Sequence, residues 1–256
     1  MTTALHDKPP VGGRIRQRGF TLAEVLISMT ISTVVLGMVL TINLQSSKQL
    51  FYSQQKSLIN TDIRNITERL AADARDASFF VLYSNYTVAA RTSIGQRLVE
   101  GNPGDFLLLV YYDDRDPPPD PIHFNVLPLW KLVGYYRAPY QPGQADPITN
   151  DPYGMPVRRF ELSTDAGTLA HNLYIMDAAH TPAGGTYVTL ESLLPNDASA
   201  TIKSHQIIVQ LADGLADGLL FYNFWNKSIM VNAKIDHGNN AKQITDTYNF
   251  TVSPRG

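Results

Sequence analysis

The chain has 256 residues, of which 44% are hydrophobic and 17% charged, a composition typical of folded rather than disordered proteins. Its formal net charge of −2 gives no indication of nucleic-acid binding, and its lack of cysteine excludes disulfides, thiol catalysis and cysteine-ligated metal sites. A chain of this length has room for one membrane element and one globular domain with a core of its own.

The chain begins with a basic segment, which an apolar run follows. Residues 1–19 carry Lys8, Arg14, Arg16 and Arg18 against a single acidic residue, Asp7. Residues 25–47 contain no charge, and at ~1.5 Å per residue they reach ~34 Å as a helix, enough to cross a bilayer. The basic flank predicts a cytoplasmic N-terminus, with everything after the apolar run on the other side of the membrane.

Glu24 is the one charged residue within positions 19–47. A carboxylate is tolerated near the N-terminal end of a membrane helix, where its insertion cost is lower and the helix dipole favours it. A cleaved secretory signal would have a shorter apolar run and an Ala-x-Ala site, which are absent here. A plain signal anchor fits the length but leaves Glu24 unexplained.

The stretch RGFTLAEVLI, residues 18–27, resembles the class III signal of type IV pilins and type II secretion pseudopilins. The resemblance implies that a membrane peptidase cuts between Gly19 and Phe20 on the cytoplasmic side and methylates the new Phe20 amine. It also implies that Glu24, the fifth mature residue, pairs with the Phe20 amine of a neighbouring subunit. Opposite charges ~4 Å apart attract by about 4 kcal/mol at an effective dielectric near 20. Without this context, Gly19 would be interpreted as a turn residue.

Residues 38–94 contain neither glycine nor proline, which favours a long helix. We expect one helix from about Phe20 to about Phe80, with residues 20–47 in the membrane and residues 48–82 forming an amphipathic half that packs on a domain. The apolar residues of this half recur every three or four positions, a helical stripe that would also fit a short coiled coil. The stripe comprises Ile59, Ile63, Ile66, Leu70, Ala74, Ala77 and Val81.

Residues 83–256 contain short runs rich in Val, Ile, Tyr and Phe between turn residues, typical of β-strands. The predicted fold class is therefore α+β: a long N-terminal transmembrane and amphipathic helix packed on an antiparallel β-sheet in an extracytoplasmic domain. The predicted strands span residues 106–112, 122–127, 130–137, 157–163, 173–176, 206–211, 219–225, 229–235 and 248–252.

Several stretches resemble the J-type minor pseudopilins and W-type minor pilins more than other members of the class. They include "LLLVYYDD", "KLVGYYR" and a final hairpin formed by residues 228–235 and 248–253. Many major pilins have a proline about 22 residues into the mature helix, where this chain has Thr41. Both features favour a minor subunit.

No familiar catalytic motif is present in the sequence, and no cofactor is expected. The six histidines are scattered, so each is interpreted as a loop or half-buried residue rather than a ligand. A proline-containing loop carries four acidic residues that could offer oxygen ligands to calcium, although their spacing is not that of an EF-hand, and a solvated loop is the simpler interpretation. These residues are Asp113, Asp114, Asp116 and Asp120. The near-repeat "ADGLADG" at residues 212–218 is interpreted as turns.

The expected function is that of a minor pilin or pseudopilin, a non-enzymatic subunit at or near the tip of a type II secretion pseudopilus or type IV pilus. The expected partners are the prepilin peptidase/methyltransferase, other pilins or pseudopilins and the inner membrane, which the chain would cross once with its C-terminal domain in the periplasm; no nucleic-acid partner is expected. The alternative is a membrane-anchored envelope protein whose β domain binds a ligand or catalyses a reaction. The sequence does not separate secretion, motility and DNA uptake.

Overall fold

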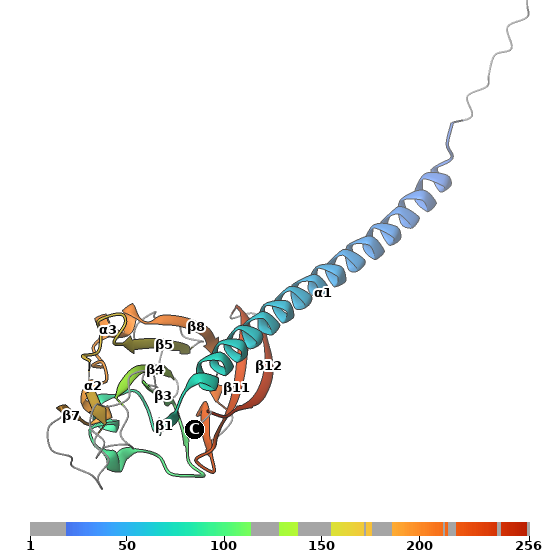
Figure 1. Cartoon of the computed structure of the whole chain (residues 1–256). Coiled ribbons are helices and arrows are strands. Elements are labelled where there is room, and N and C mark those ends of the chain that lie inside the picture. The colour runs from blue at the N-terminus through green and yellow to red at the C-terminus, as the bar shows by residue number, and fades with distance from the viewer. Residues whose placement is uncertain are drawn as a thin grey trace, which may run out of the picture. The chain divides into compact units, whose positions relative to one another are not determined.

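A 55-residue helix, α1 (Leu22–Asp76), opens the described part of the chain (Figure 1). The computed structural model describes residues 19–113, 128–137, 155–171, 173–175, 186–211, 213–214, 219–239 and 242–254. By its internal contacts the chain divides into two units, residues 1–51 and residues 52–256, and α1 contributes to both. Each unit is described by itself below.

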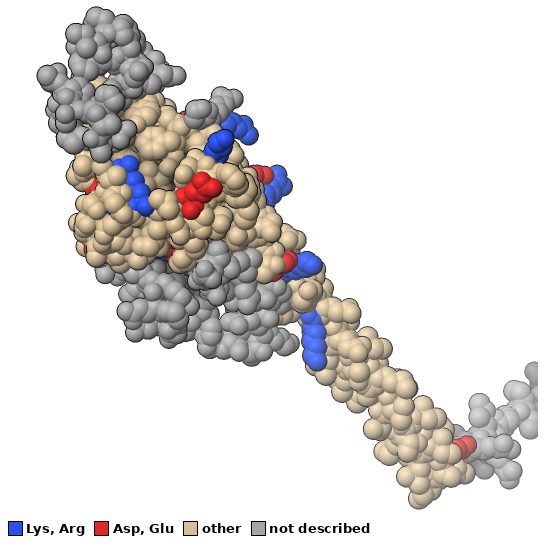
Figure 2. All heavy atoms as spheres, turned by 90° about the horizontal axis from the view of Figure 1, so that it is seen from below, with Lys and Arg blue, Asp and Glu red and all other residues tan. Residues whose placement is uncertain are grey.

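In the first unit, α1 has no protein core to pack on. Every residue from 19 to 50 is exposed, and leucine, isoleucine, valine and methionine occupy all sides of the helix. Figure 2 shows the same property, because few charged side chains interrupt the N-terminal half of α1. The predicted helix start at Phe20 is two residues early, a difference within the usual spread of helix boundaries.

The predicted C-terminal end of the helix was wrong. The helix was expected to reach about Phe80 within an amphipathic half spanning residues 48–82, but α1 ends at Asp76 and β1 (Phe79–Tyr83) follows. The five residues of β1, FFVLY, are aromatic, β-branched or aliphatic, and such side chains fit a pleated sheet. The Ser78 N–H donates to the Val110 carbonyl at 2.8 Å, so sheet pairing begins two residues after the helix ends.

The first sheet of the second unit has five strands in the order β1–β3–β4–β5–β8, and all neighbours are antiparallel. The strands that follow β1 are β3 (Phe106–Tyr112), β4 (Leu129–Arg137), β5 (Met155–Ser163) and β8 (Gln206–Leu211). The predicted bounds of β3 and β8 are confirmed. The predicted strands that correspond to β4 and β5 start one and two residues, respectively, after the observed first residues.

The second sheet is ordered β12–β11–β10–β2, and β9 also pairs with β11. It contains the predicted final hairpin, whose strands pair from Ile229 opposite Val252 to Asn239 opposite Lys242 and are longer than expected. Asp213 and Gly214, predicted as turn residues, form the short strand β9. The strands are β2 (Pro103–Gly104), β9 (Asp213–Gly214), β10 (Phe221–Phe224), β11 (Ser228–Asn239) and β12 (Lys242–Val252).

Short elements that the sequence did not predict complete the described fold. One is the parallel pairing of β6 (Leu173–Ile175), a predicted strand, with β7 (Thr186–Val188), which was not predicted. The others are two single-turn 3₁₀ helices and the helices α2 (Leu190–Leu193) and α3 (Ser199–Ser204). The predicted strand at residues 122–127 lies outside the described residues. The α+β fold class is confirmed.

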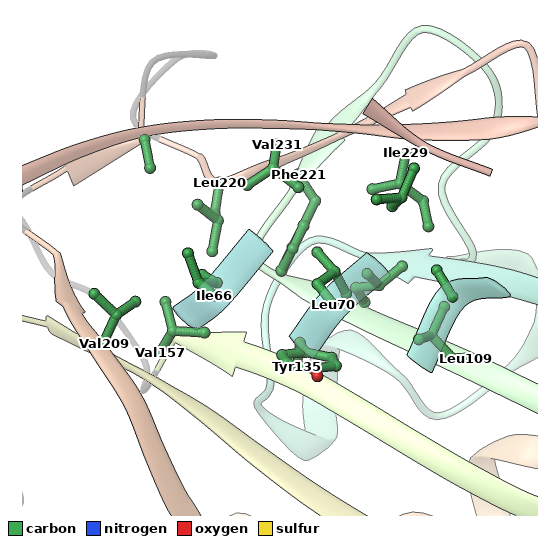
Figure 3. Packing of buried hydrophobic residues seen from close by; sticks show 14 of the residues in the cluster. Ile66, Leu70, Leu109, Tyr135, Val157, Val209, Leu220, Phe221, Ile229 and Val231 are labelled. Carbon is green, nitrogen blue, oxygen red and sulfur yellow. The ribbon is translucent and has the colours of Figure 1, made fainter. Parts of the chain in front are cut away.

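The main core forms where the C-terminal part of α1 lies between the two sheets. In Figure 3, Ile66 and Leu70 have Val157 and Tyr135 on one side and Phe221 on the other. The predicted stripe is therefore buried from two directions rather than packed on one sheet, and each buried Ile or Leu contributes about 1.5–3 kcal/mol. Val81, the last stripe position, instead faces a second cluster across the first sheet, because it belongs to β1.

A polar network also joins α1 to the first sheet. One carboxylate oxygen of Asp73, Oδ2, accepts hydrogen bonds from the Tyr135 hydroxyl at 2.5 Å and from the Arg159 Nε at 2.8 Å. Arg159 also pairs with Glu161 at 2.6 Å, and the Tyr111 hydroxyl donates to the Asp73 carbonyl. Burial and the Asp73 charge raise the pKa of Tyr135, so its hydroxyl stays a donor at physiological pH. This network sets the position of the helix along the sheet.

Candidate processing and assembly site

The residues predicted to carry function lie together at the start of α1. Gly19 and Phe20 are exposed and non-helical, and Thr21 separates them from the first helical residue, Leu22. Phe20 is 86% exposed. Glu24 lies in the first turn of the helix. The structure thus presents an exposed, non-helical Gly-Phe dipeptide followed within four residues by a carboxylate.

Thr21 and Glu24 form a reciprocal capping arrangement that determines where the helix begins. The Thr21 N–H and hydroxyl donate to Glu24 Oε2 at 2.9 Å and 3.0 Å, and the Glu24 N–H donates to Thr21 Oγ1 at 3.3 Å. The first helical bond follows from the Val25 N–H to the Thr21 carbonyl. These contacts satisfy amide donors that a helix N-terminus otherwise leaves unpaired. The Thr-x-x-Glu signal was present in the sequence but was not interpreted as a cap.

The cap leaves part of the Glu24 carboxylate available. Both of its side-chain hydrogen bonds end on Oε2, so Oε1 has no hydrogen-bond donor among the described residues. The carboxylate is exposed and lies at the positive end of the helix dipole, which stabilises its negative charge. A held carboxylate with one free oxygen is suited to bind a cationic amine.

Hydroxyl groups in the apolar run bond within their own helix. Ser28 Oγ donates to the Glu24 carbonyl at 2.8 Å, Thr33 Oγ1 to the Met29 carbonyl at 2.8 Å and Thr41 Oγ1 to the Gly37 carbonyl at 2.9 Å. Such bonds allow polar side chains to remain in an apolar environment without an external partner. Among the described residues α1 alone is long and apolar enough to cross a membrane, which supports membrane anchoring.

The other residues considered in the sequence do not converge on a reactive centre within the described chain. His205 accepts or donates a 2.6 Å hydrogen bond with the Tyr136 hydroxyl, and burial together with the Arg158 charge lowers its pKa to about 4. Asp114, Asp116 and Asp120 lie outside the described residues, so calcium binding there stays a hypothesis. The described residues contain no group of three or more acidic or histidine side chains suited to a metal ion.

The comparison with protein families matches this same segment. Residues 14–40 match the family model of the prokaryotic N-terminal methylation motif, a range that includes Gly19, Phe20 and Glu24. No curated protein and no solved structure matches the chain. The motif indicates a prepilin-like substrate of prepilin peptidase, and proteins with such a segment are structural. The motif and the apolar helix together support a type IV pilin-like class for this chain.

Proposed function

We propose that the chain is a minor pilin or pseudopilin, incorporated at or near the tip of a type II secretion pseudopilus or type IV pilus after cleavage and N-methylation. The observation that carries the proposal is the arrangement at the start of α1. There, an exposed and non-helical Gly19-Phe20 bond precedes a capped helix that presents Glu24. Its partners are the prepilin peptidase/methyltransferase and other pilins or pseudopilins in the same membrane.

The geometry favours cleavage between Gly19 and Phe20. Because the cap starts the helix at Leu22, the peptidase meets backbone that needs no unwinding before it enters an active site. Gly19 carries no side chain, and nothing lies within 4 Å of the place where a Cβ would be. Hydrolysis leaves a free amine on Phe20, which is the atom that the methylation motif implies as the methyl acceptor.

Glu24 is proposed to dock the subunit during assembly. Its free Oε1 would accept a hydrogen bond and a charge interaction from the Phe20 amine of another subunit, while Oε2 stays bound to Thr21. Thr21 would thereby hold the carboxylate in one orientation before the partner arrives, which reduces the entropy lost on binding.

The remaining assignments follow from the same proposal. Residues 1–19 would be a cytoplasmic leader, residues 20–47 the membrane span and residues 83–256 the periplasmic domain, joined by the amphipathic half of α1. The β11–β12 hairpin supports the likeness to J-type pseudopilins and W-type pilins, because a terminal strand pair was expected of them. Thr41 supports a minor subunit, because α1 continues through it as a regular helix.

Intact mass spectrometry of the protein recovered from membranes tests the processing step. The expected mature form lacks residues 1–19 and carries one additional methyl group on Phe20. Gly19→Leu should leave the precursor uncut, because a bulky side chain next to the scissile bond blocks entry to the active site, while the matched change Gly37→Leu in the apolar run should be processed normally. A mature form that keeps Met1, or one cut beyond residue 40, would refute the proposal.

Crosslinking of mature subunits tests the docking step. Glu24→Ala should still be inserted and cut, since the change removes a charge from the apolar run, but its crosslinks to other pilin-like subunits should fall. Breaking a buried pair on one side costs about 3–5 kcal/mol. Thr21→Ala helps to separate the two roles of Glu24, because it removes the hydroxyl contacts of the cap and keeps the carboxylate. Equal crosslinking of wild type and Glu24→Ala would show that Glu24 has no docking role.

A further inference from the structure

The turn between β10 and β11 carries exposed aromatic side chains. Phe224 is 43% exposed and Trp225 is 63% exposed, and Val99 on the neighbouring loop is 66% exposed. We name Val99, Phe224 and Trp225 the hairpin-tip patch. Scattered exposed apolar residues are ordinary, but tryptophan is enriched where one protein binds another.

The backbone under this patch adopts an unusual conformation. Trp225 has φ +58° and Asn226 has φ +52°, both in the left-handed region. Asparagine occupies that region readily, whereas a bulky side chain there is an outlier. The Lys227 N–H closes the turn on the Phe224 carbonyl at 3.2 Å. Positive φ at both central residues is ordinary in a tight hairpin turn, so the unusual feature here is the bulky tryptophan at the first of them.

A buried asparagine imposes this conformation. Asn223 Nδ2 donates to Asn226 Oδ1 at 2.6 Å and to the Leu98 carbonyl at 3.2 Å, and its Oδ1 accepts from the Asn226 N–H. The Gly101 N–H donates to the Asn223 carbonyl at 2.9 Å. These hydrogen bonds therefore join the turn to the loop that carries Val99. They fix the backbone from which the exposed Trp225 side chain projects. A preorganised aromatic anchor loses little entropy on binding.

We propose that the hairpin-tip patch is a contact surface between two copies of this chain anchored in the same membrane. The charges beside it are self-complementary, because Glu100 precedes the loop glycine and Lys227 ends the turn, and both residues are exposed. A two-fold axis would bring Lys227 of each copy toward Glu100 of the other. A membrane surface fits less well, since adsorption to anionic lipid favours several basic residues.

The small size of the patch fits partners that already share a membrane. Three apolar side chains cover far less than the ~800 Å² per partner typical of a stable soluble complex. Two molecules held by their α1 helices in one bilayer meet at high effective concentration, so a weak contact is sufficient. The inference rests on the proposed function only through membrane anchoring, and it requires neither cleavage at Gly19 nor pairing by Glu24.

The absence of cysteine allows a direct test in the full-length protein in membranes. A single Val99→Cys variant treated with a short bismaleimide should give crosslinked dimers of this chain. A matched variant, Thr251→Cys on an exposed position of β12, should give few. Adding Trp225→Ser to Val99→Cys should lower the dimer yield about tenfold, the loss typical of a removed aromatic anchor, while Trp225→Phe should retain most of it. Lys227→Glu should also lower the yield, and adding Glu100→Lys should restore it.

Two results would overturn the inference: equal dimer yields from the two cysteine positions, or crosslinks that form only to a different protein. A Lys227→Glu defect that Glu100→Lys does not reverse would exclude the two-fold contact even if Trp225→Ser misfolds. The mass of the protein in the same samples shows whether it has been processed, so failure of the dimer contact can be distinguished from failure of the proposed function. Processed protein without dimers refutes the contact alone, and dimers of uncut precursor refute the processing alone.

Discussion

Along α1, Ile66 and Leu70 are completely buried, whereas Leu36 and Ile42 are each 61% exposed, although the backbone is helical at all four positions. The two regions also differ in pattern. Near Ile66 the apolar residues form one stripe with charged residues on the other sides, and near Leu36 they occupy every side. A helix that is apolar on all sides requires an apolar surrounding, which in the first unit the protein does not provide.

The comparison shows that helical propensity does not determine whether either half of α1 is buried in the protein or left exposed. Both halves lack glycine and proline over most of their length, and what separates them is the partner for their apolar surface. For residues 52–76 the partner is a pair of β-sheets, and for residues 22–50 a bilayer is the solvent that suits them. Substitutions in the two halves should therefore differ in kind.

The largest expected effect is that of deleting a buried leucine. Leu70→Ala should lower the free energy of unfolding of the domain by about 4 kcal/mol, because it leaves a cavity between the two sheets. Leu36→Ala should leave that quantity unchanged, since Leu36 contacts no core. Denaturant titration of both full-length variants in detergent, followed by tryptophan fluorescence, measures the difference. Similar losses in the two variants would mean that the halves of α1 are not independent.

A smaller loss is expected from the polar network on the same half. Asp73→Ala should cost about 3 kcal/mol, near the lower limit for a broken buried pair, because Arg159 keeps Glu161 as a partner. The matched change Glu68→Ala breaks an exposed pair with Arg64 and should cost less than ~1 kcal/mol. The same denaturant titration compares them, and equal costs would exclude a fastening role for Asp73.

Acid should weaken the domain through His205, whereas the membrane half of α1 contains no histidine. The folded state holds the pKa of His205 at about 4, below its ordinary value of 6.5, so the unfolded chain binds a proton more readily between these values. The stabilisation is complete above pH 6.5 and is lost as the pH falls toward 4. Because His205 is partly exposed, we expect a loss of about 1 to 2 kcal/mol. His205→Gln should flatten the stability profile between pH 6.5 and 4, and an unchanged profile would contradict the assignment.

The smallest effect is expected at the start of the helix. Thr21→Ala removes the hydroxyl contacts of the cap and should destabilise the first turn by about 1 kcal/mol, without changing the unfolding of the domain. Amide hydrogen exchange of residues 22–25 should accelerate accordingly. Thr33→Ala is the control, because its hydroxyl bonds only to a carbonyl within the helix. Equal exchange in both variants would show that the cap does not define the helix start.

Periodicity predicted the stripe from Ile59 to Ala74 because three- and four-residue spacing reports directly on one face of a helix. The same spacing wrongly predicted a helix at Val81, because it continues by chance into β1. There the conformation depends on pairing with β3. The division of the strands between two sheets was equally inaccessible, because it depends on contacts between residues far apart in the sequence. The α+β class itself needed only the local patterns.

The candidate site was found from sequence because its residues are contiguous. Gly19, Phe20 and Glu24 lie within six positions. Once the helix start is assigned, their sequence spacing alone therefore places all three at one end of the helix. Glu24 was interpreted through its charge alone, so its hydrogen bonds to Thr21 and its role in capping the helix were not predicted. Asp73 was missed for a different reason: its partners Tyr135 and Arg159 approach it only in the folded domain.

The burial of α1 between two sheets has a consequence for biosynthesis. The stripe around Ile66 is made well before Ile229 and Val252, which help to cover it and lie far later in the sequence. Contacts across such separations form slowly, and chains with uncovered apolar surface aggregate. The growing polypeptide therefore carries an unprotected hydrophobic surface until the strands that cover α1 have been made, and shielding by a chaperone would be needed for this helix throughout that interval.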